Sequence, residues 1–537
     1  MWPDLVGQDG LVDLSRVIET STVVAGTRSR TAKVEALAQT LRDAADESSR
    51  IEPDETVEVV TDYLSGRLPQ RRIGVSWRGL QDLPAPAGEA SLTVLATHQA
   101  LDRIAQVAGI GSAGLRRGAI DALMGRATKQ EQRWLASLIT GEMRQGASDG
   151  VMLQAIARAA GVDDSVVRAA VMRAGFAGPV AQGALAAPTP DAAVAALVAI
   201  DLHVGRPLRP MLAGSAPSVA QALSGVVAVE RKLDGIRIQA HITAAANPRL
   251  VSIFTRTLED ITDRVPEVVQ ALGALPVDAA VLDGEILVLR SDGRPAPFQV
   301  TGARTASSAD PERLMVEAPL TTYLFDAMHI DGVDLLDTQA AKRWDRLAAV
   351  APDLLVPRVV TDDVEAAQEF FKAQIAAGHE GVILKALDAP YAAGRRGAGW
   401  VKVKPRYTFD LVVTGVEWGS GRRRGLLSNI HLAARDNSTG DLVMLGKTFK
   451  GMTDEILTWQ TARFLELEVE RKGQLVVVRP EQVVEVAIDG VQRSTRYPGG
   501  IALRFARVLR YREDKGASDI DTLEHVIDTC GGIFDGS

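Results

Sequence analysis

One lysine lies in a segment whose composition suits covalent chemistry. The segment separates two runs of mostly apolar residues and reads Glu230-Arg231-Lys232-Leu233-Asp234-Gly235. An amine attacks an electrophile once its pKa is low enough to expose the lone pair, whereas a guanidinium stays protonated. Only 12 of the 60 basic residues are lysine, which makes Lys232, at the end of a predicted strand, a candidate nucleophile. By itself the pattern also fits a hairpin turn with a solvated lysine.

Five further segments carry charged residues beside short apolar runs. In chain order they are Phe254-Thr255-Arg256 with Glu259-Asp260, Leu282-Asp283-Gly284-Glu285, Phe325-Asp326 followed by Asp331-Gly332, Glu380-Gly381-Val382-Ile383-Leu384-Lys385, and Trp400-Val401-Lys402-Val403-Lys404. Phosphoryl transfer needs cations at the phosphate oxygens, a metal ion held by carboxylates and an in-line nucleophile. The six segments together supply all of these residue types.

In type and order these segments resemble the motifs of covalent nucleotidyltransferases, and most closely those of ATP-dependent DNA ligases, over residues 205–405. The stretch from Ser494 to Arg507, with Lys515, resembles the last ligase motif, except that Ala506 stands where many members have proline. The resemblance implies that the lysine takes AMP from ATP and expels pyrophosphate. AMP then passes to the 5′-phosphate of nicked duplex DNA, and the 3′-hydroxyl seals the strand.

The resemblance also implies roles for single residues. Lys232 would be the nucleophile, with its pKa lowered by nearby cations and burial, and the other catalytic residues would be Asp234, Lys402 and Lys404. Mg²⁺ or Mn²⁺ would lie at Glu285 and Glu380. The implied ATP contacts are Glu230 and Phe325 at the base, and Arg237, Arg256, Glu285, Arg396 (or its neighbour Arg395), Lys402 and Arg504. From the residues alone, Phe325 also fits core packing, Arg256 a surface ion pair, and each glutamate a turn or strand end.

The first 200 residues have a helical pattern. Apolar residues recur at three-to-four spacing over residues 33–46, 117–125 and 130–140, and breakers over 176–190 predict a hinge or helix boundary. A GxGxxG pattern at 109–114 follows a helical stretch instead of a strand, which argues against a dinucleotide site. The region resembles the DNA-binding domain of archaeal and eukaryotic-type ligases, and this implies phosphate contacts from Gly111, Ser112 and Arg144.

The rest of the chain alternates short β-rich runs with a few helical stretches. This pattern predicts an all-α domain at 1–204 and an α/β (α+β) domain at 205–405. The resemblance implies that the first binds DNA and that the second is an ATP-grasp-like adenylation domain. Short strands with one helical piece near 453–470 predict an OB-fold β-barrel at 406–515, and residues 516–537 form an acidic tail.

Charge and composition favour duplex DNA as the partner. Residues 406–515 hold 18 basic and 14 acidic residues, although the whole chain has a net charge of −8. Arg422, Arg423 and Arg424 lie between glycines and are candidate phosphate contacts, or else a solvated loop tip. Aromatic residues make up only 4 %, so binding to the duplex backbone is favoured over base stacking.

The remaining features narrow the function. Cys530 is the only cysteine, so disulfides and four-cysteine zinc modules are excluded and a reducing cytoplasm is indicated. We expect no export signal or membrane span, and a monomer active in replication, repair or recombination. An RNA ligase, a capping guanylyltransferase and a catalytically silent DNA-end-binding scaffold are the alternatives. The helical region argues against the first two, and the full set of reactive lysines and glutamates argues against the third.

Overall fold

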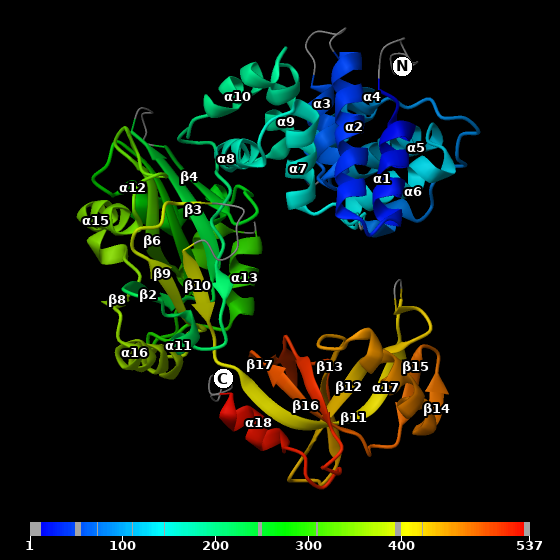
Figure 1. The fold of residues 1–537 in the computed structure, drawn as a ribbon, viewed down its shortest axis with the longest axis vertical. Coiled ribbons are helices and arrows are strands. Elements are labelled where there is room, and N and C mark those ends of the chain that lie inside the picture. Colours follow the sequence, from blue (N-terminus) through cyan, green and yellow to red (C-terminus); the bar gives the residue numbers. More distant parts are fainter. Residues whose placement is uncertain are drawn as a thin grey trace.

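The computed structural model describes residues 12–48, 55–71, 73–109, 111–143, 145–244, 250–307, 310–392, 399–420 and 423–530. Along the chain a helical domain is followed by a mixed α/β domain and then a β-rich domain, and the middle one contacts both others (Figure 1). This order confirms the three predicted fold classes. None of the described helices is long and apolar enough to cross a bilayer.

The helical domain packs around a single apolar core. Each of the three predicted helical stretches lies within a helix, and the breakers over 176–190 fall at the boundaries of α9 and α10. A capping box of Thr128 and Glu131 begins α6, because the two side chains satisfy N–H groups that the helix leaves unpaired. The helices are α1 (Leu14–Gly26), α2 (Arg30–Ser48), α3 (Thr56–Leu64), η1 (Trp77–Leu80), α4 (Val94–Gln106), α5 (Ser112–Gly125), α6 (Lys129–Thr140), α7 (Asp149–Ala160), α8 (Asp164–Ala174), α9 (Ala177–Leu185) and α10 (Pro190–Val198).

The middle domain contains two five-stranded sheets. One has the strand order β1-β10-β9-β2-β8 and the other β4-β3-β5-β6-β7, and only β1 and β10 are parallel neighbours. The strands are β1 (Gly214–Ser215), β2 (Val227–Lys232), β3 (Ile236–Thr243), β4 (Leu250–Thr255), β5 (Ala279–Val288), β6 (Leu320–Ile330), β7 (Val333–Asp334), β8 (Arg358–Thr361), β9 (Gly381–Ala386) and β10 (Trp400–Val403). The helices are α11 (Val219–Ala222), η2 (Thr262–Arg264), α12 (Pro266–Gly273), α13 (Phe298–Ala306), α14 (Pro311–Glu317), α15 (Ala340–Val350), η3 (Pro352–Leu354) and α16 (Val364–Ala376).

Helices cover the sheets, and aromatic residues lie between them. Apolar side chains of α12 and α15 pack on the β3–β5 sheet, and those of α11 and α16 pack on the β2–β9 sheet. The cluster between the sheets contains Phe325, Tyr391 and Trp400. The chain crosses from one sheet to the other between β2 and β3, so the residues after Lys232 form the crossover.

The C-terminal domain is a strongly curved antiparallel sheet around one core. β11 pairs with β12 along one edge, while on the other edge its first half pairs with β16 and its second half with β15. A register shift between Val413 and Gly415 allows this bend. The elements are β11 (Tyr407–Trp418), β12 (Leu427–Arg435), β13 (Leu442–Thr448), α17 (Asp454–Glu466), β14 (Glu468–Lys472), β15 (Leu475–Val478), β16 (Val483–Ile488), β17 (Gly490–Arg493), β18 (Ile501–Arg504), β19 (Arg507–Arg512) and α18 (Leu523–Thr529).

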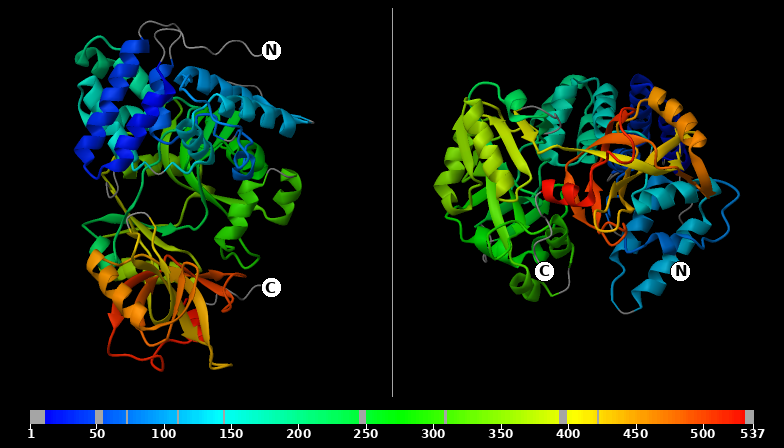
Figure 2. Two further views of the ribbon diagram at one scale, coloured as in Figure 1. Left: turned by 90° about the vertical axis from the view of Figure 1, so that its right-hand side faces the viewer. Right: turned by 90° about the horizontal axis from the view of Figure 1, so that it is seen from below.

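One predicted strand at this end of the chain needs correction, and part of the acidic tail is helical. The strand predicted over 503–508 is two strands, because Phe505 adopts a left-handed φ of 55° that ends β18. The predicted acidic tail is folded as far as residue 530, because α18 packs Val526, with Cys530 beyond it, into the barrel core. Figure 2 shows α18 against the barrel. Residues 531–537 lie outside the described part of the chain.

Candidate active site

Lys232 ends β2 opposite Gly381 of the neighbouring strand β9. Its amine forms an ion pair with one carboxylate oxygen of Glu380, and the other oxygen pairs with Lys404 at the end of β10. All three side chains are mostly buried. Three residues that the sequence places far apart therefore share one polar contact.

The charges around Lys232 differ from those we expected. Burial by itself would lower the pKa of the amine, but the carboxylates of Glu380, Glu285 and Asp234 outweigh burial and raise it. The prediction that nearby cations lower this pKa is therefore wrong for the protein without nucleotide. The pKa of Lys402 is lowered instead, by burial and by the charges of Lys404 and Lys232.

Glu285 fixes the crossover turn. It lies on β5, opposite Arg237 of β3, and its carboxylate accepts a hydrogen bond from the Gly235 N–H at 2.7 Å. A Cβ on Gly235 would overlap the carbonyl oxygen of Ile286, so the turn requires glycine there. Burial raises the pKa of Glu285 to about 7.

Arg237 and Phe325 are both engaged in the core between the sheets. The Arg237 guanidinium forms two hydrogen bonds with Asp283, at 2.9 and 2.5 Å, and a third with the Met211 carbonyl at 2.6 Å. The Phe325 ring packs edge-on against Trp400, with centroids 5.8 Å apart. Both residues thus lie beside the crossover.

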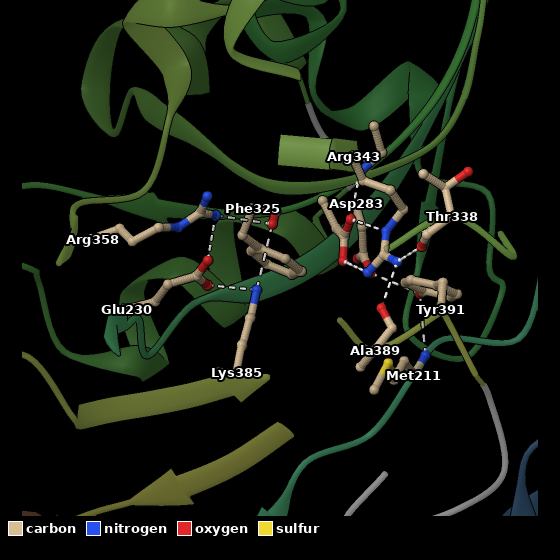
Figure 3. Close-up of polar contacts among 12 residues, drawn as sticks. Met211, Glu230, Asp283, Phe325, Thr338, Arg343, Arg358, Lys385, Ala389 and Tyr391 are labelled. Atoms are coloured by element: carbon tan, nitrogen blue, oxygen red, sulfur yellow. Dashed lines mark hydrogen bonds and ion pairs between the residues drawn. The ribbon is translucent and has the colours of Figure 1, made fainter. Parts of the chain in front are cut away.

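Glu230 belongs to a buried cluster of charges that Figure 3 shows. One carboxylate oxygen pairs with Arg358 and the other with Lys385 at 2.5 Å, and both cations also donate to the Phe325 carbonyl. Lys385 is 1 % exposed, and burial lowers its pKa. The sequence patterns predict no specific role for Lys385 or Arg358.

Two contacts link the barrel to this site. Arg504 of β18 reaches Asp234 in the crossover turn at 3.1 Å, and Lys404 lies 3.4 Å from Asp489. Arg256 is exposed on the turn after β4, and its charge acts on Lys402. The structure therefore brings Lys232, Glu285, Glu380 and Lys404 together with Arg504. Asp331, which follows β6, instead donates a backbone hydrogen bond to Ala279 at the start of β5.

The remaining predicted residues lie elsewhere. Gly111 caps the start of α5 with a φ of 81°, and Ser112 is the first residue of that helix. Arg423 donates from its guanidinium to the Phe449 carbonyl at 2.6 Å, while Arg424 is exposed. Arg144, Arg395, Arg396 and Arg422 lie outside the described residues.

The described residues contain no cluster of three or more metal-ligating side chains. The two carboxylates implied for a metal ion, Glu285 and Glu380, both act electrostatically on Lys232 and therefore lie near it. They provide the hard oxygen ligands that Mg²⁺ and Mn²⁺ prefer, and a bound nucleotide would have to supply further oxygens.

Comparisons with known proteins cover nearly the whole chain. Residues 210–404 match the ATP dependent DNA ligase domain, residues 423–515 the ATP dependent DNA ligase C terminal region, and residues 76–157 the DNA ligase N terminus. Proteins named "Probable DNA ligase" from Nocardioides sp. and Kineococcus radiotolerans are 56 % and 55 % identical, and each alignment covers 96 % of this chain and 99 % of the relative.

Solved structures show the same fold. The chain described as Pmar-Lig_PreS3 is 19 % identical with a TM-score of 0.57, and the alignment covers 92 % of this chain and 99 % of that one. A second, described as Pmar-Lig_Pre, has a TM-score of 0.58. Because relatives of more than half identity span almost its full length, this chain belongs to the ATP-dependent DNA ligase family and is an ATP-dependent enzyme that acts on nicked DNA.

Proposed function

We propose that Lys232 is the amine that takes AMP from ATP and passes it to the 5′-phosphate at a nick. The observation that carries this role is the position of Lys232 at the crossover between the two sheets, in contact with Glu380 and near Glu285 and Lys402. The amine would displace pyrophosphate from the α-phosphorus and form a P–N bond. The 5′-phosphate oxygen would then displace the lysine, and the 3′-hydroxyl would finally displace AMP.

The carboxylates around Lys232 explain how its reactivity is controlled. Glu285 and Glu380 would hold Mg²⁺ or Mn²⁺, which when bound supplies positive charge to the phosphates. In this chain the Glu380 ion pair raises the pKa of Lys232, and burial opposes it. The amine would have to leave this ion pair and lose its proton before it attacks the α-phosphorus.

Cations and aromatic residues provide the rest of the nucleotide site. Lys402 and Lys404 would contact the α-phosphate, and Arg256 and Arg504 approach the same region from the β4 turn and the barrel. Between the sheets, Phe325 would stack on the base. Arg237 would contact the ribose, and Glu230, held by its two cations, would accept a hydrogen bond from the adenine amino group.

Duplex DNA would contact the helical domain and the barrel. The start of α5, at Gly111 and Ser112, presents backbone N–H groups, and Arg423 and Arg424 lie on a barrel loop. We propose a monomer in the bacterial cytoplasm that serves replication, repair or recombination. The single cysteine and the bacterial sources of the relatives support this placement.

A labelling experiment tests the assignment. Purified protein is incubated with Mg²⁺ and ATP labelled in the α-phosphate, and a singly nicked duplex is then added. We expect covalent label on the wild-type protein, which the nicked DNA discharges as the strand is sealed. Lys232→Ala should take up no label while it still binds the nick, because the variant loses only the amine.

Other outcomes point to other functions. Label from GTP would favour a capping activity, and label discharged only by RNA would favour an RNA ligase. Sealing by Lys232→Ala at the wild-type rate would remove this residue from the mechanism. Lys342→Ala is a matched control, because Lys342 lies on α15 and takes part in none of the contacts described above.

A further inference from the structure

The turn after β4 carries Arg256 at the edge of the active site. Thr255 pairs with Ile238 of β3, and the preceding residue of that strand, Arg237, pairs with Glu285 of β5. Arg256 therefore continues the same end of the sheet that holds Glu285. Where its guanidinium lies depends on the backbone of residues 255–259.

That turn is tightly closed. The Leu258 N–H donates to the Thr255 carbonyl, and the Thr255 N–H donates to the Glu259 carbonyl, both at 2.8 Å. Leu258 has a left-handed φ of 63°. A non-glycine residue keeps such a conformation only where surrounding contacts hold it.

The holding contacts come from the helical domain. Arg71, which follows α3, donates a hydrogen bond from its guanidinium to the Leu258 carbonyl. The Leu258 side chain is buried against Gly175 at the end of α8, where a Cβ would crowd Leu258 and overlap the Pro207 carbonyl oxygen. Leu258 is thus fixed by its carbonyl and by its side chain from another domain.

The backbone around Arg71 is itself held by hydrogen bonds within the helical domain. The Arg71 N–H donates to the Leu68 carbonyl at 2.9 Å, and its backbone is also left-handed, with a φ of 57°. The adjacent Gln70 donates to Asp102 of α4 at 2.7 Å. Two left-handed residues, one from each domain, therefore meet at one charge-assisted hydrogen bond.

We propose that Arg71 is a positioning residue for the nucleotide chemistry, holding the Leu258 backbone so that Arg256 faces the reacting phosphate. The helical domain then does more than bind DNA, because its seating on the adenylation domain sets the geometry of an active-site cation. The proposal rests on the proposed function in one respect, the role of Arg256 as a phosphate contact.

The test uses the full-length chain with Arg71→Met, Arg71→Lys, Arg256→Met and the Arg71→Met/Arg256→Met double variant. Single-turnover rates of lysyl-AMP formation and of nick sealing are measured separately. Arg71→Met should slow, by about tenfold, the step that Arg256→Met slows, because a charge-assisted hydrogen bond is lost. Arg71→Lys should recover much of the rate, since an ammonium also donates to a carbonyl. The double variant should be no slower than Arg256→Met alone.

Arg173→Met is the matched control. Arg173 also pairs across the two domains, with Asp337 at 3.5 Å, but this ion pair includes no residue of the 255–259 turn. We expect wild-type rates for it. If Arg71→Met does not fold, Leu258→Gly replaces it, because glycine keeps the positive φ while removing the side-chain contact.

The outcomes separate the two proposals. Defects that multiply in the double variant would overturn the positioning role, as would wild-type rates for Arg71→Met or a defect in a step that Arg256→Met leaves unchanged. A wild-type protein that takes no label from ATP would contradict the proposed function instead.

Discussion

The carboxylates of Glu380, Glu285 and Asp234 raise the pKa of Lys232 and favour its charged form. Glu380 has the central place, since it pairs with Lys232 on one oxygen and Lys404 on the other. A lysine held in this way is a poor nucleophile toward other electrophiles in the cell. In the proposed reaction, the amine of Lys232 must therefore leave this ion pair before it attacks ATP.

The crossover turn depends on Gly235, whose Cβ position is occupied by the Ile286 carbonyl oxygen. Gly235→Ala must push the turn away from β5 and break the 2.7 Å hydrogen bond to Glu285. We expect lysyl-AMP formation to fall at least tenfold. Gly118→Ala on α5 is the control, because a Cβ there meets open space, and a helical alanine is expected to be neutral or stabilising. Equal activity of the two variants would contradict this role of the turn.

His241 makes stability depend on pH. Burial lowers its pKa to about 3, and its ring accepts from the Gly205 N–H at 2.9 Å. The unfolded chain, with a histidine pKa near 6.5, therefore binds one proton more than the folded chain between about pH 6.5 and 3. The contribution of His241 to the free energy of unfolding is fully present above pH 6.5 and is lost as the pH falls through that window.

His241→Gln should remove this contribution. Between pH 7.5 and pH 5, the wild type should lose about 2 kcal/mol more free energy of unfolding than the variant does. Urea unfolding at the two pH values measures the difference. Parallel losses in both proteins would show that His241 is not the group responsible.

At the scale of elements, a buried ion pair joins α15 to β6. Arg343 and Asp326 are both fully buried, and the guanidinium makes two hydrogen bonds to the carboxylate, at 2.8 and 2.9 Å. Arg343 also donates to the Thr338 and Ala389 carbonyls (Figure 3). One side chain thus holds a helix, a strand and the loop after β9 together.

Arg343→Met leaves the Asp326 carboxylate buried without its partner. We expect the free energy of unfolding to drop by about 3–5 kcal/mol, the usual cost of breaking a buried pair from one side. Chemical denaturation measures it. The Arg343→Met/Asp326→Asn double variant should recover part of the loss, and a double variant worse than the single would refute the explanation.

The sequence predicted most of the helices and strands. It did not predict which strands pair with one another or which distant side chains meet. Apolar runs bounded by glycine or aspartate did become strands, and Lys232, Glu285 and Glu380, from three separate segments, lie close to one another. Neighbouring strands β2 and β3 lie in different sheets, however, and local periodicity carries no information on that choice. Arg358 and Tyr391 were missed because they come from segments without a motif and act only through tertiary contacts.

At the scale of the whole molecule, side-chain contacts join the barrel to the adenylation domain, and two of them lie at the candidate site. Arg504 reaches Asp234, and Lys404, in the segment between β10 and β11, contacts Glu380 on one side and Asp489 on the other. Both are partly exposed ion pairs, which contribute little stability each and weaken with salt. The barrel can therefore separate from the adenylation domain at low cost in free energy.

Arg504→Ala should favour the conformation in which the barrel is separated from the adenylation domain. Without nucleotide or DNA, the variant should show a larger radius of gyration in small-angle X-ray scattering than the wild type, and high salt should expand the wild type in the same direction. Lysyl-AMP formation should slow as well. Arg510→Ala is the control, because Arg510 pairs with Glu485 of the same domain and not with the adenylation domain. Identical scattering from all three proteins would argue against a role of the Arg504–Asp234 ion pair in holding the barrel in place.

The folding of α18 onto the barrel sets where the third domain stops. The match to the ligase C-terminal region ends at residue 515, but Val526 is fully buried in the barrel core and Cys530 nearly so. A chain shortened after Lys515 would keep every strand of the barrel, but the apolar core residues that α18 covers would be exposed to solvent. Such a truncated protein would be prone to self-association, because the surface it uncovers is as apolar as a core.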